Sequence, residues 1–175
     1  PTSQPTLSFD PSAKTAMDKQ EPPAPGADFR VVIVGAGNIN FGSDEGPWNH
    51  SFRLEHKLGP RLKVVALIDP DAERARRVLK TKCQSFVLSA YKDTVVYPTF
   101  KDYMASVCAE TYPHAVWVGS PPAFRGGTEP GRNLEQLLTA GLPNVPLFIE
   151  KPVSTGAVDQ TFEVAKMLEQ NGSLV

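Results

Sequence analysis

The chain has 175 residues, of which 41% are hydrophobic and 21% charged, enough for one globular domain with a real core. Its 18 basic and 19 acidic residues give a formal net charge of −1, which argues against nucleic acid as a partner. No apolar run approaches the roughly 20 residues of a membrane helix, and the first residues lack the pattern of a signal peptide. Cys83 and Cys108 form no disulfide framework, which favours free thiols and a cytoplasmic location.

The first segment, residues 1–28, is rich in Pro, Ser and Thr and has few large apolar residues. Such a composition cannot bury enough surface to offset the entropy lost on ordering. We therefore predict an extended or disordered arm, with a partner-binding tail as the alternative. The chain begins without methionine, which is typical of a processed or trimmed product.

Short apolar runs follow this arm, and each lacks polar alternation. They occupy residues 29–34, 62–68, 115–118 and 146–149, and residues 95–97 form a weaker candidate. Runs of this kind are typical of strands that are covered on both faces, as in a parallel sheet.

Helical patterns lie between the expected strands. They are the Ala- and Arg-rich residues 72–80, a capping box at Thr99 with an apolar face of Phe100, Tyr103, Met104 and Val107, a face of Leu134, Leu137 and Leu138, and a face of Val158, Phe162, Ala165 and Leu168. Gly141 is expected to be a C-terminal cap. Strands that alternate with helices form βαβ units with right-handed crossovers. The sequence therefore predicts an α/β fold, a doubly wound, mainly parallel Rossmann sheet with helices on both faces.

A glycine-rich turn, Gly35-Ala36-Gly37-Asn38-Ile39-Asn40, directly follows the first expected strand. The first glycine allows a tight turn, and the second lets a pyrophosphate approach the backbone amides, including those of Asn38 and Ile39. Asn40 stands where the G-x-G-x-x-G pattern has its third glycine. We predict a dinucleotide-binding turn, with a plain turn that binds no ligand as the alternative.

A long loop from Phe41 to Trp48 separates this turn from the next helical pattern. We expect the first helix to begin only after Pro47 and to carry Phe52, Leu54 and Leu58.

Asp69 ends the second expected strand. In a dinucleotide site an acid at this point accepts hydrogen bonds from the adenosine ribose. It also repels a 2′-phosphate, so we expect NAD(H) to be favoured over NADP(H). The alternative is that Asp69 caps a helix with Pro70 at its first position, and one residue can do both.

The last expected strand runs into Glu150-Lys151-Pro152. A cation at the carboxyl end of a parallel strand faces the ligand crevice. Such a lysine can bind a substrate hydroxyl or carbonyl beside a nicotinamide and assist proton transfer. Taken alone, the tripeptide is more typical of a surface turn.

The order of these motifs, with Gly119-Ser120-Pro121-Pro122 after a later strand, resembles the Gfo/Idh/MocA family of oxidoreductases. The resemblance covers residues 29–175 and implies an N-terminal Rossmann domain, which a C-terminal substrate domain follows in the family. It implies hydride transfer between NAD(P) and a sugar, polyol or related hydroxyl compound. Lys151 would be the catalytic residue, and Ser120, Pro121, Pro122, Glu150 and Lys151 would line the nicotinamide side.

This sequence departs from the family pattern at Asn40, in the inserted loop, and at Arg125 and Gly126, where a histidine is common. The substrate domain is missing, so we expect an isolated chain to be inactive. The alternatives are a non-catalytic NAD(P)-binding regulator, since the family's fold is reused in this way, and an interaction subunit with an empty site.

Ser173-Leu174-Val175 reads as the start of a sixth strand. A sheet that ends there would leave an open edge, which favours pairing with another chain. We therefore expect an excerpt of a longer protein or a partner in an assembly such as a homo-oligomer. No metal is expected, because the spacing of His50, His56 and His114 fits no ligand pattern.

Overall fold

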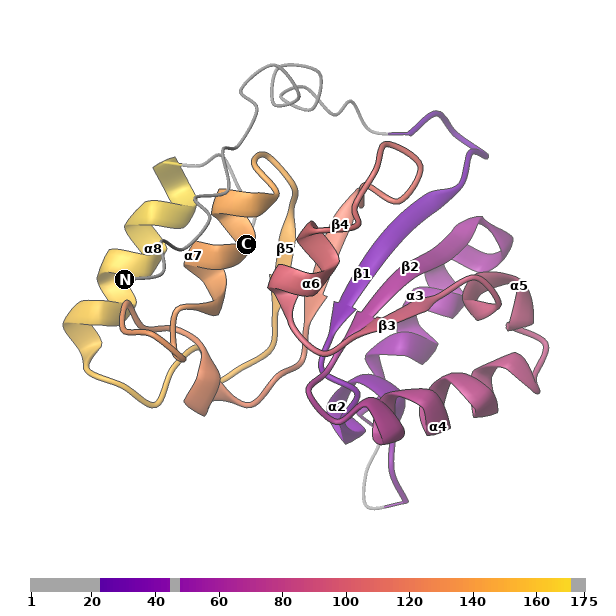
Figure 1. Cartoon of the computed structure of the whole chain (residues 1–175), viewed down its shortest axis with the longest axis horizontal. Helices are drawn as coiled ribbons and strands as arrows, with labels where there is room; N and C mark the ends of the chain where they lie inside the picture. The colour runs from indigo at the N-terminus through magenta and orange to yellow at the C-terminus, as the bar shows by residue number, and fades with distance from the viewer. Residues whose placement is uncertain (1–22, 45–47, 171–175) are drawn as a thin grey trace, which may run out of the picture.

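The computed structural model describes residues 23–44 and 48–170. A central parallel sheet runs through this part of the chain (Figure 1). Its strands are β1 (Phe29–Val34), β2 (Leu62–Ile68), β3 (Val95–Tyr97), β4 (Ala115–Val118) and β5 (Leu147–Ile149), in the order β3-β2-β1-β4-β5. All strand pairs are parallel, which confirms the predicted doubly wound Rossmann fold.

The strand order places a topological switch point between β1 and β4. From β1 the chain continues to β2 and β3 on one side, and it then crosses to β4 and β5 on the other. The loops that leave β1 and β4 therefore run to opposite faces of the sheet and leave a crevice between them. The β1–β4 register pairs Val34 with Val118, so both strands end at the same level.

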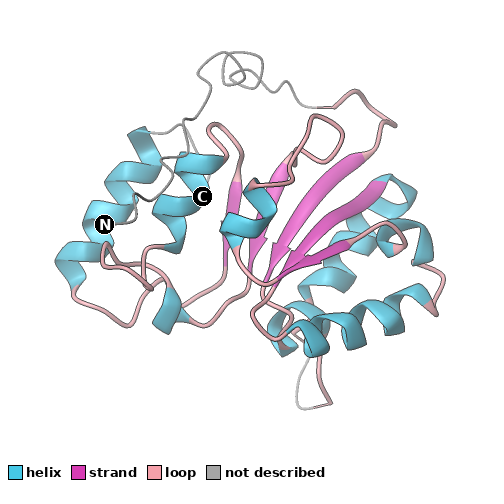
Figure 2. Cartoon of the chain, in the orientation of Figure 1, coloured by secondary structure: helices cyan, strands magenta, loops and turns pink. Residues whose placement is uncertain are grey.

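Helices cover both faces of the sheet (Figure 2). They are α2 (Asn38–Phe41), α3 (His50–Leu58), η1 (Gly59–Arg61), α4 (Ala72–Cys83), α5 (Leu88–Tyr91), α6 (Phe100–Met104), η2 (Pro122–Phe124), α7 (Leu134–Gly141) and α8 (Val158–Gln170). One core cluster joins alternate β1 and β2 side chains to α3, α4 and α5, and the other joins the opposite faces of the strands to α6, α7 and α8. The non-alternating apolar runs follow from this two-sided burial.

The first long helix begins at His50, after Pro47 as predicted, and Leu54 is buried in the core. Phe52 is an exception, because 59% of it is exposed. The sequence pattern did not predict α2, a four-residue turn directly after the glycines. Such a short turn carries too few residues for a hydrophobic period to show.

Two helical expectations need correction. Gly141 is the last residue of α7 rather than its cap, and a Cβ there would lie 2.8 Å from Cζ of Phe100, so glycine is needed for close packing. In α8, Leu168 is buried as predicted, but Val158 and Phe162 are 70% and 71% exposed, and Val164, which was not predicted, is the other buried residue. The described sheet ends at β5, so no described strand lies beyond it to cover the outer side of α8.

The predicted arm lies largely outside the described residues, and so does the strand expected at residues 173–175. Within the described ranges, none of the helices is long and apolar enough to cross a membrane.

Candidate functional site

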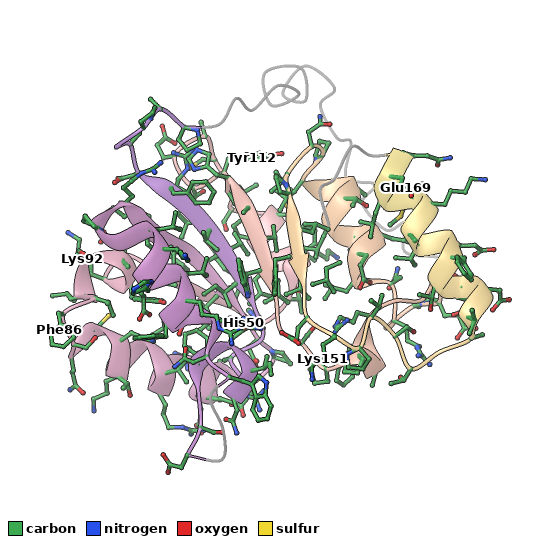
Figure 3. All side chains as sticks on the ribbon, turned by 180° about the vertical axis from the view of Figure 1, so that it is seen from behind. His50, Phe86, Lys92, Tyr112, Lys151 and Glu169 are labelled. Atoms are coloured by element: carbon green, nitrogen blue, oxygen red, sulfur yellow. The ribbon has the colours of Figure 1, made fainter. Side chains whose placement is uncertain are left out.

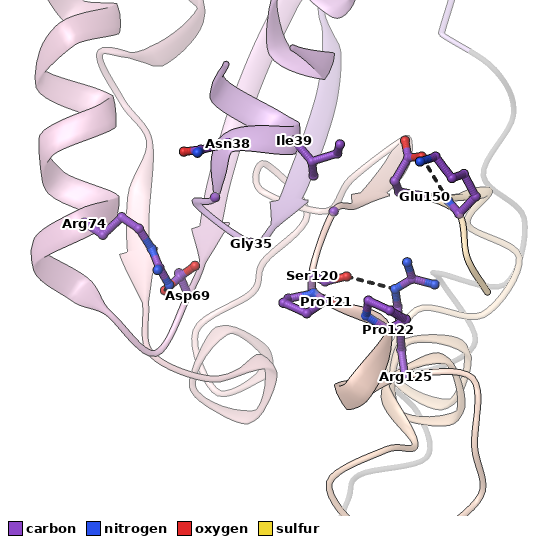
Figure 4. A pocket seen from close by; sticks show the side chains of 13 residues that line it. Gly35, Asn38, Ile39, Asp69, Arg74, Ser120, Pro121, Pro122, Arg125 and Glu150 are labelled. Atoms are coloured by element: carbon purple, nitrogen blue, oxygen red, sulfur yellow. Dashed lines mark hydrogen bonds and ion pairs between the residues drawn. The ribbon is translucent and has the colours of Figure 1, made fainter. Parts of the chain in front are cut away.

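A cavity of about 330 Å³ opens at the carboxyl ends of the strands, around the switch point. Figure 4 shows its lining side chains from close by. The residues that line it are Gly35, Gly37, Asn38, Ile39, Asp69, Arg74, Gly119, Ser120, Pro121, Pro122, Arg125, Glu150 and Lys151. The structure thus brings together every site residue that the sequence predicted and adds Gly119 and two arginines. Its volume falls in the range of about 300–1,000 Å³ that is common for ligand sites.

The two glycines of the turn serve different purposes. Gly35 has φ +96°, and a Cβ on it would lie 3.0 Å from the Ser120 nitrogen, so the protein's own packing requires glycine there. Gly37 has φ −79°, and a Cβ on it would meet no protein atom within 4 Å. The fold itself therefore does not need glycine at position 37, and the space beside it opens to the cavity.

Asn40 takes the place of the missing third glycine. It is fully buried, and its side-chain amide donates to the carbonyl oxygens of Val34 at 3.1 Å and of Gly35 at 2.7 Å. Gly119 provides the space, because a Cβ on it would lie 2.4 Å from the Asn40 side-chain oxygen. Gly119, in the loop after β4, thus makes room for the larger Asn40 in the turn after β1. The hydrogen bonds of Asn40 stabilise that turn.

Asp69 is 3% exposed and links the glycine turn to α4. Its Oδ2 accepts from the Ala36 backbone N–H at 2.6 Å. Its Oδ1 accepts from the Asp71 N–H at 2.8 Å and from the Arg74 guanidinium at 2.9 Å. A carboxylate has roughly four lone-pair sites, so this set of donors leaves one acceptor site free on a residue that lines the cavity.

The alternative role for Asp69, as the cap of α4, is wrong. The N-cap is Asp71, whose side chain accepts from the Arg74 N–H at 2.9 Å, and the helix starts at Ala72. That backbone hydrogen bond lowers the pKa of the Asp71 carboxyl. The hydrogen bond to Asp69 raises the pKa of the Arg74 guanidinium, so Arg74 stays charged beside the cavity.

Arg125 is a buried cation that the sequence analysis did not include in the site. It is 1% exposed, and it donates to the carbonyl oxygens of Ser120 at 2.9 Å and Val153 at 2.8 Å. These bonds connect the loop after β4 to the loop after β5. Burial lowers the pKa of its guanidinium. The sequence feature that could have identified Arg125 is its position after Pro121-Pro122, where the family that this sequence resembles commonly has a histidine.

Glu135, on α7, lies behind this arginine and is fully buried. Its Oε2 accepts from the Gly126 N–H at 2.8 Å. Burial raises the pKa of its carboxyl, although the Gly126 bond and the charge of Arg125 act in the opposite direction. The loop after η2 is therefore held by two buried ionisable residues, Arg125 and Glu135.

Glu150 and Lys151 follow β5 and close the other side of the cavity. One Glu150 carboxylate oxygen accepts from the Lys151 backbone N–H at 3.1 Å, and the other forms a hydrogen bond with Nε2 of His50. Lys151 is exposed, and within the described residues no carboxylate lies in ion-pair range of its ammonium. Residues 23–44 and 48–170 contain no cluster of His, Cys, Asp and Glu that could hold a metal.

Comparison with known proteins assigns this arrangement to a family. The model of the oxidoreductase family with an NAD-binding Rossmann fold, Gfo/Idh/MocA, matches residues 29–175. The chain therefore belongs to this family, of which it carries the NAD-binding Rossmann domain.

Two relatives from Schizosaccharomyces pombe share 41% sequence identity with this chain. They are the uncharacterized protein C12C2.04, matched over 86% of this chain and 40% of its own length, and the uncharacterized protein UNK4.17, matched over 87% and 38%. The chain thus spans about two fifths of the length of these relatives.

Solved structures share the fold at low sequence identity. The WlbA dehydrogenase from Chromobacterium violaceum, in complex with NADH and UDP-GlcNAcA, matches with a TM-score of 0.58 and 16% identity over 88% of this chain and 36% of its own. A super-repressor mutant of Gal80p from Saccharomyces cerevisiae matches with a TM-score of 0.58 and 17% identity over 84% and 33%. The fold is therefore common to a dehydrogenase and to a protein named as a repressor.

Proposed function

We propose that this domain binds NAD(H) across the switch-point cavity and forms the cofactor half of an oxidoreductase that acts on a sugar, polyol or related hydroxyl compound. The observation that carries the proposal is the contrast between the two glycines. Gly35 is required by protein packing, whereas no contact among the described residues requires a glycine at position 37. A ligand phosphate that approaches the backbone there would explain why position 37 is a glycine.

The residues around the cavity fit two parts of a dinucleotide, the pyrophosphate and the nicotinamide half. The amides of Asn38 and Ile39 precede the first backbone bond of α2, which Asn40 donates to Gly37, so they remain available to phosphate oxygens. On the far side, the Ser120 hydroxyl is buried without a hydrogen-bond partner among the described residues. It is a candidate partner for the nicotinamide half.

Asp69 supports the proposed preference for NAD(H) over NADP(H). Its remaining lone pair can accept from a ribose hydroxyl, and its charge opposes a 2′-phosphate. Arg74 acts in the other direction, because its guanidinium is 2.9 Å from Asp69 and 44% of its side chain is exposed. We propose that Asp69 dominates because three donors fix it in place, whereas the single charge of Arg74 is already shared with it.

Lys151 is proposed as the catalytic residue of the complete enzyme. A bound nicotinamide would supply the hydride chemistry. The Lys151 ammonium would donate a hydrogen bond to the reacting oxygen of the substrate and move a proton to or from it. We further propose a substrate domain outside this chain, because an open cavity alone does not hold a substrate at the roughly 3–3.5 Å that reaction requires.

A second candidate function is a regulator that binds NAD(H) without turnover. The fold similarity to a Gal80p super-repressor favours keeping it. The two candidates differ at Lys151: a regulator does not need its ammonium, whereas the oxidoreductase does. In the protein that carries this domain, Lys151→Met would abolish turnover and leave cofactor affinity within about threefold, whereas a regulator would show no turnover before or after the change.

Calorimetric titration of NADH and NADPH into the chain tests the proposal. We expect NADH to bind more tightly than NADPH. Asp69→Asn should reduce or reverse that difference, because it removes the charge that opposes the 2′-phosphate. Arg74→Gln is the matched control and should weaken NADPH more than NADH. The absence of binding of either dinucleotide at millimolar concentration would overturn the proposed function.

A further inference from the structure

A buried histidine is hydrogen-bonded to the residue that precedes the proposed catalytic lysine. His50 is the first residue of α3 and is 2% exposed, and Glu150, one hundred positions along the chain, is the residue that follows β5. The imidazole Nε2 is hydrogen-bonded to the Glu150 carboxylate. Because an ionised carboxylate only accepts, Nε2 must carry the proton. Figure 3 shows His50 and Lys151 near the same end of the sheet.

Aromatic packing fixes this imidazole. Its ring lies 5.5 Å from Trp117 and 5.1 Å from Phe148, and these two rings stack on each other at 3.9 Å. The other imidazole nitrogen, Nδ1, is buried and has no hydrogen-bond partner in the described part of the chain. Among the described residues, Glu150 is thus the one polar partner of the His50 side chain, and it offsets part of the cost of burying a polar ring.

Each oxygen of Glu150 therefore accepts a hydrogen bond from a donor other than the Lys151 ammonium. Oε2 is bound to His50, and Oε1 accepts from the Lys151 backbone N–H. Adjacent residues of opposite charge do pair elsewhere in this chain, since Lys92 and Asp93 lie 3.8 Å apart. The absence of such a pair at Glu150 and Lys151 coincides with the hydrogen bond from His50.

We propose that His50 is a positioning residue for Lys151, because it holds the Glu150 carboxylate and so prevents it from neutralising the ammonium beside the cavity. The value of a free ammonium there rests on the proposed function of Lys151. Loss of the imidazole donor would release a partly buried carboxylate. Its nearest route to a new partner is rotation toward the ammonium of the next residue, as in the Lys92–Asp93 pair.

The proposal is tested on the ammonium itself, without any cofactor. The rate at which an amine-reactive ester labels Lys151 is measured by mass spectrometry, relative to Lys101, an exposed lysine on α6. His50→Phe keeps an aromatic ring between Trp117 and Phe148 and removes the donor. We expect it to slow the relative labelling of Lys151 at least threefold, because an ion-paired ammonium gives up its proton less readily.

Two further variants separate positioning from simple structural support. His50→Gln places an amide N–H near the position of Nε2 and should keep the wild-type labelling rate. His50→Phe combined with Glu150→Gln should restore the rate, because the freed side chain no longer carries charge. If His50→Phe does not fold, as judged by its thermal melt, His50→Leu replaces it in both arms.

An unchanged labelling rate in a folded variant without the His50 donor would overturn the proposal, and so would a slowed rate that Glu150→Gln does not restore. NADH titration of the same variants keeps the two proposals apart. Slowed and restored labelling in a chain that binds no NADH would uphold the positioning role of His50 and refute the proposed function.

Discussion

The two sides of the switch point hold their site residues in different ways. On the β1–β2 side, a single carboxylate accepts the hydrogen bonds: Asp69 accepts from Asp71 and Arg74, two and five residues along the chain, and from the Ala36 backbone N–H, 33 residues before it. On the β4–β5 side, the loops are fixed by side chains that reach across the fold, 28 residues from Arg125 to Val153 and one hundred residues from His50 to Glu150. Figure 4 shows the two groups facing each other across the cavity.

This difference also appears in the packing. β2 is seven residues long and largely buried, whereas β5 has three residues and leaves Phe148 39% exposed. Helix α8, on the same side, exposes Val158 and Phe162. The β1–β2 side is therefore held largely by its own sheet, whereas the β4–β5 side depends more on hydrogen bonds from side chains that connect its loops. Substitution of those side chains should do the most damage.

The largest effect is expected from Arg125→Met. The change removes hydrogen bonds from a charged group to the Ser120 and Val153 carbonyls and leaves both acceptors without their donor. Bonds of this kind contribute about 1.5–3 kcal/mol each, so we expect the free energy of unfolding to fall by about 3 kcal/mol or more. Urea denaturation measures it. Arg125→Lys keeps the charge and should lose less stability than Arg125→Met. Equal losses of stability in the two variants would show that only the shape of the arginine matters.

Gly35→Ala should come next, with Gly37→Ala as its control. An alanine at position 35 adopts an unfavourable positive φ and approaches the Ser120 nitrogen to 3.0 Å, which should cost about 1–3 kcal/mol of stability. Gly37→Ala should leave stability unchanged, because its Cβ meets nothing within 4 Å. Thermal melts of both variants are the measurement. A comparable loss at both positions would refute the distinction between a structural and a ligand glycine.

A smaller effect is expected where the two sides touch, at Asn40 and Gly119. Gly119→Ala alone places a Cβ 2.4 Å from the Asn40 side chain and should destabilise the chain by about 1 kcal/mol or more. Asn40→Gly should relieve that clash, so the double variant should be more stable than the sum of the single changes predicts. Urea denaturation of all three variants gives the coupling, and simple additivity would contradict compensation between these positions.

The smallest effect is a pH dependence from Glu135. Burial raises the pKa of its carboxyl above the ordinary value of 4.5, so the folded state binds a proton more strongly than the unfolded state does. Stability from this group is present below pH 4.5 and declines as pH rises through the higher folded pKa. Glu135→Gln should remove that decline. The free energy of unfolding of wild type and variant is measured at several pH values. We expect the variant to become more stable relative to wild type as pH rises. A relative gain as pH falls would contradict this prediction.

The sequence predicts the sheet well, because two-sided burial produces continuous apolar runs that end at the glycine turn and at Asp69. It predicts the glycine turn and Lys151 because strand ends fix their place. It does not predict Arg125 or the His50–Glu150 bond, since these depend on contacts between distant segments that no local period encodes. The α8 face was predicted correctly at Leu168 but incorrectly at Val158 and Phe162, because more than one set of apolar residues has helical spacing and only packing decides which set is buried.

Backbone amide NMR of the chain during titration with NADH tests the central claim most directly. We predict that the largest shifts fall on Gly37, Asn38 and Ile39 on one side and on Ser120 and Lys151 on the other, with little change at the β3 edge. Gly37→Ala should remove these shifts while the spectrum stays that of a folded protein. Shifts confined to another surface, or none at millimolar NADH, would contradict binding across the switch point.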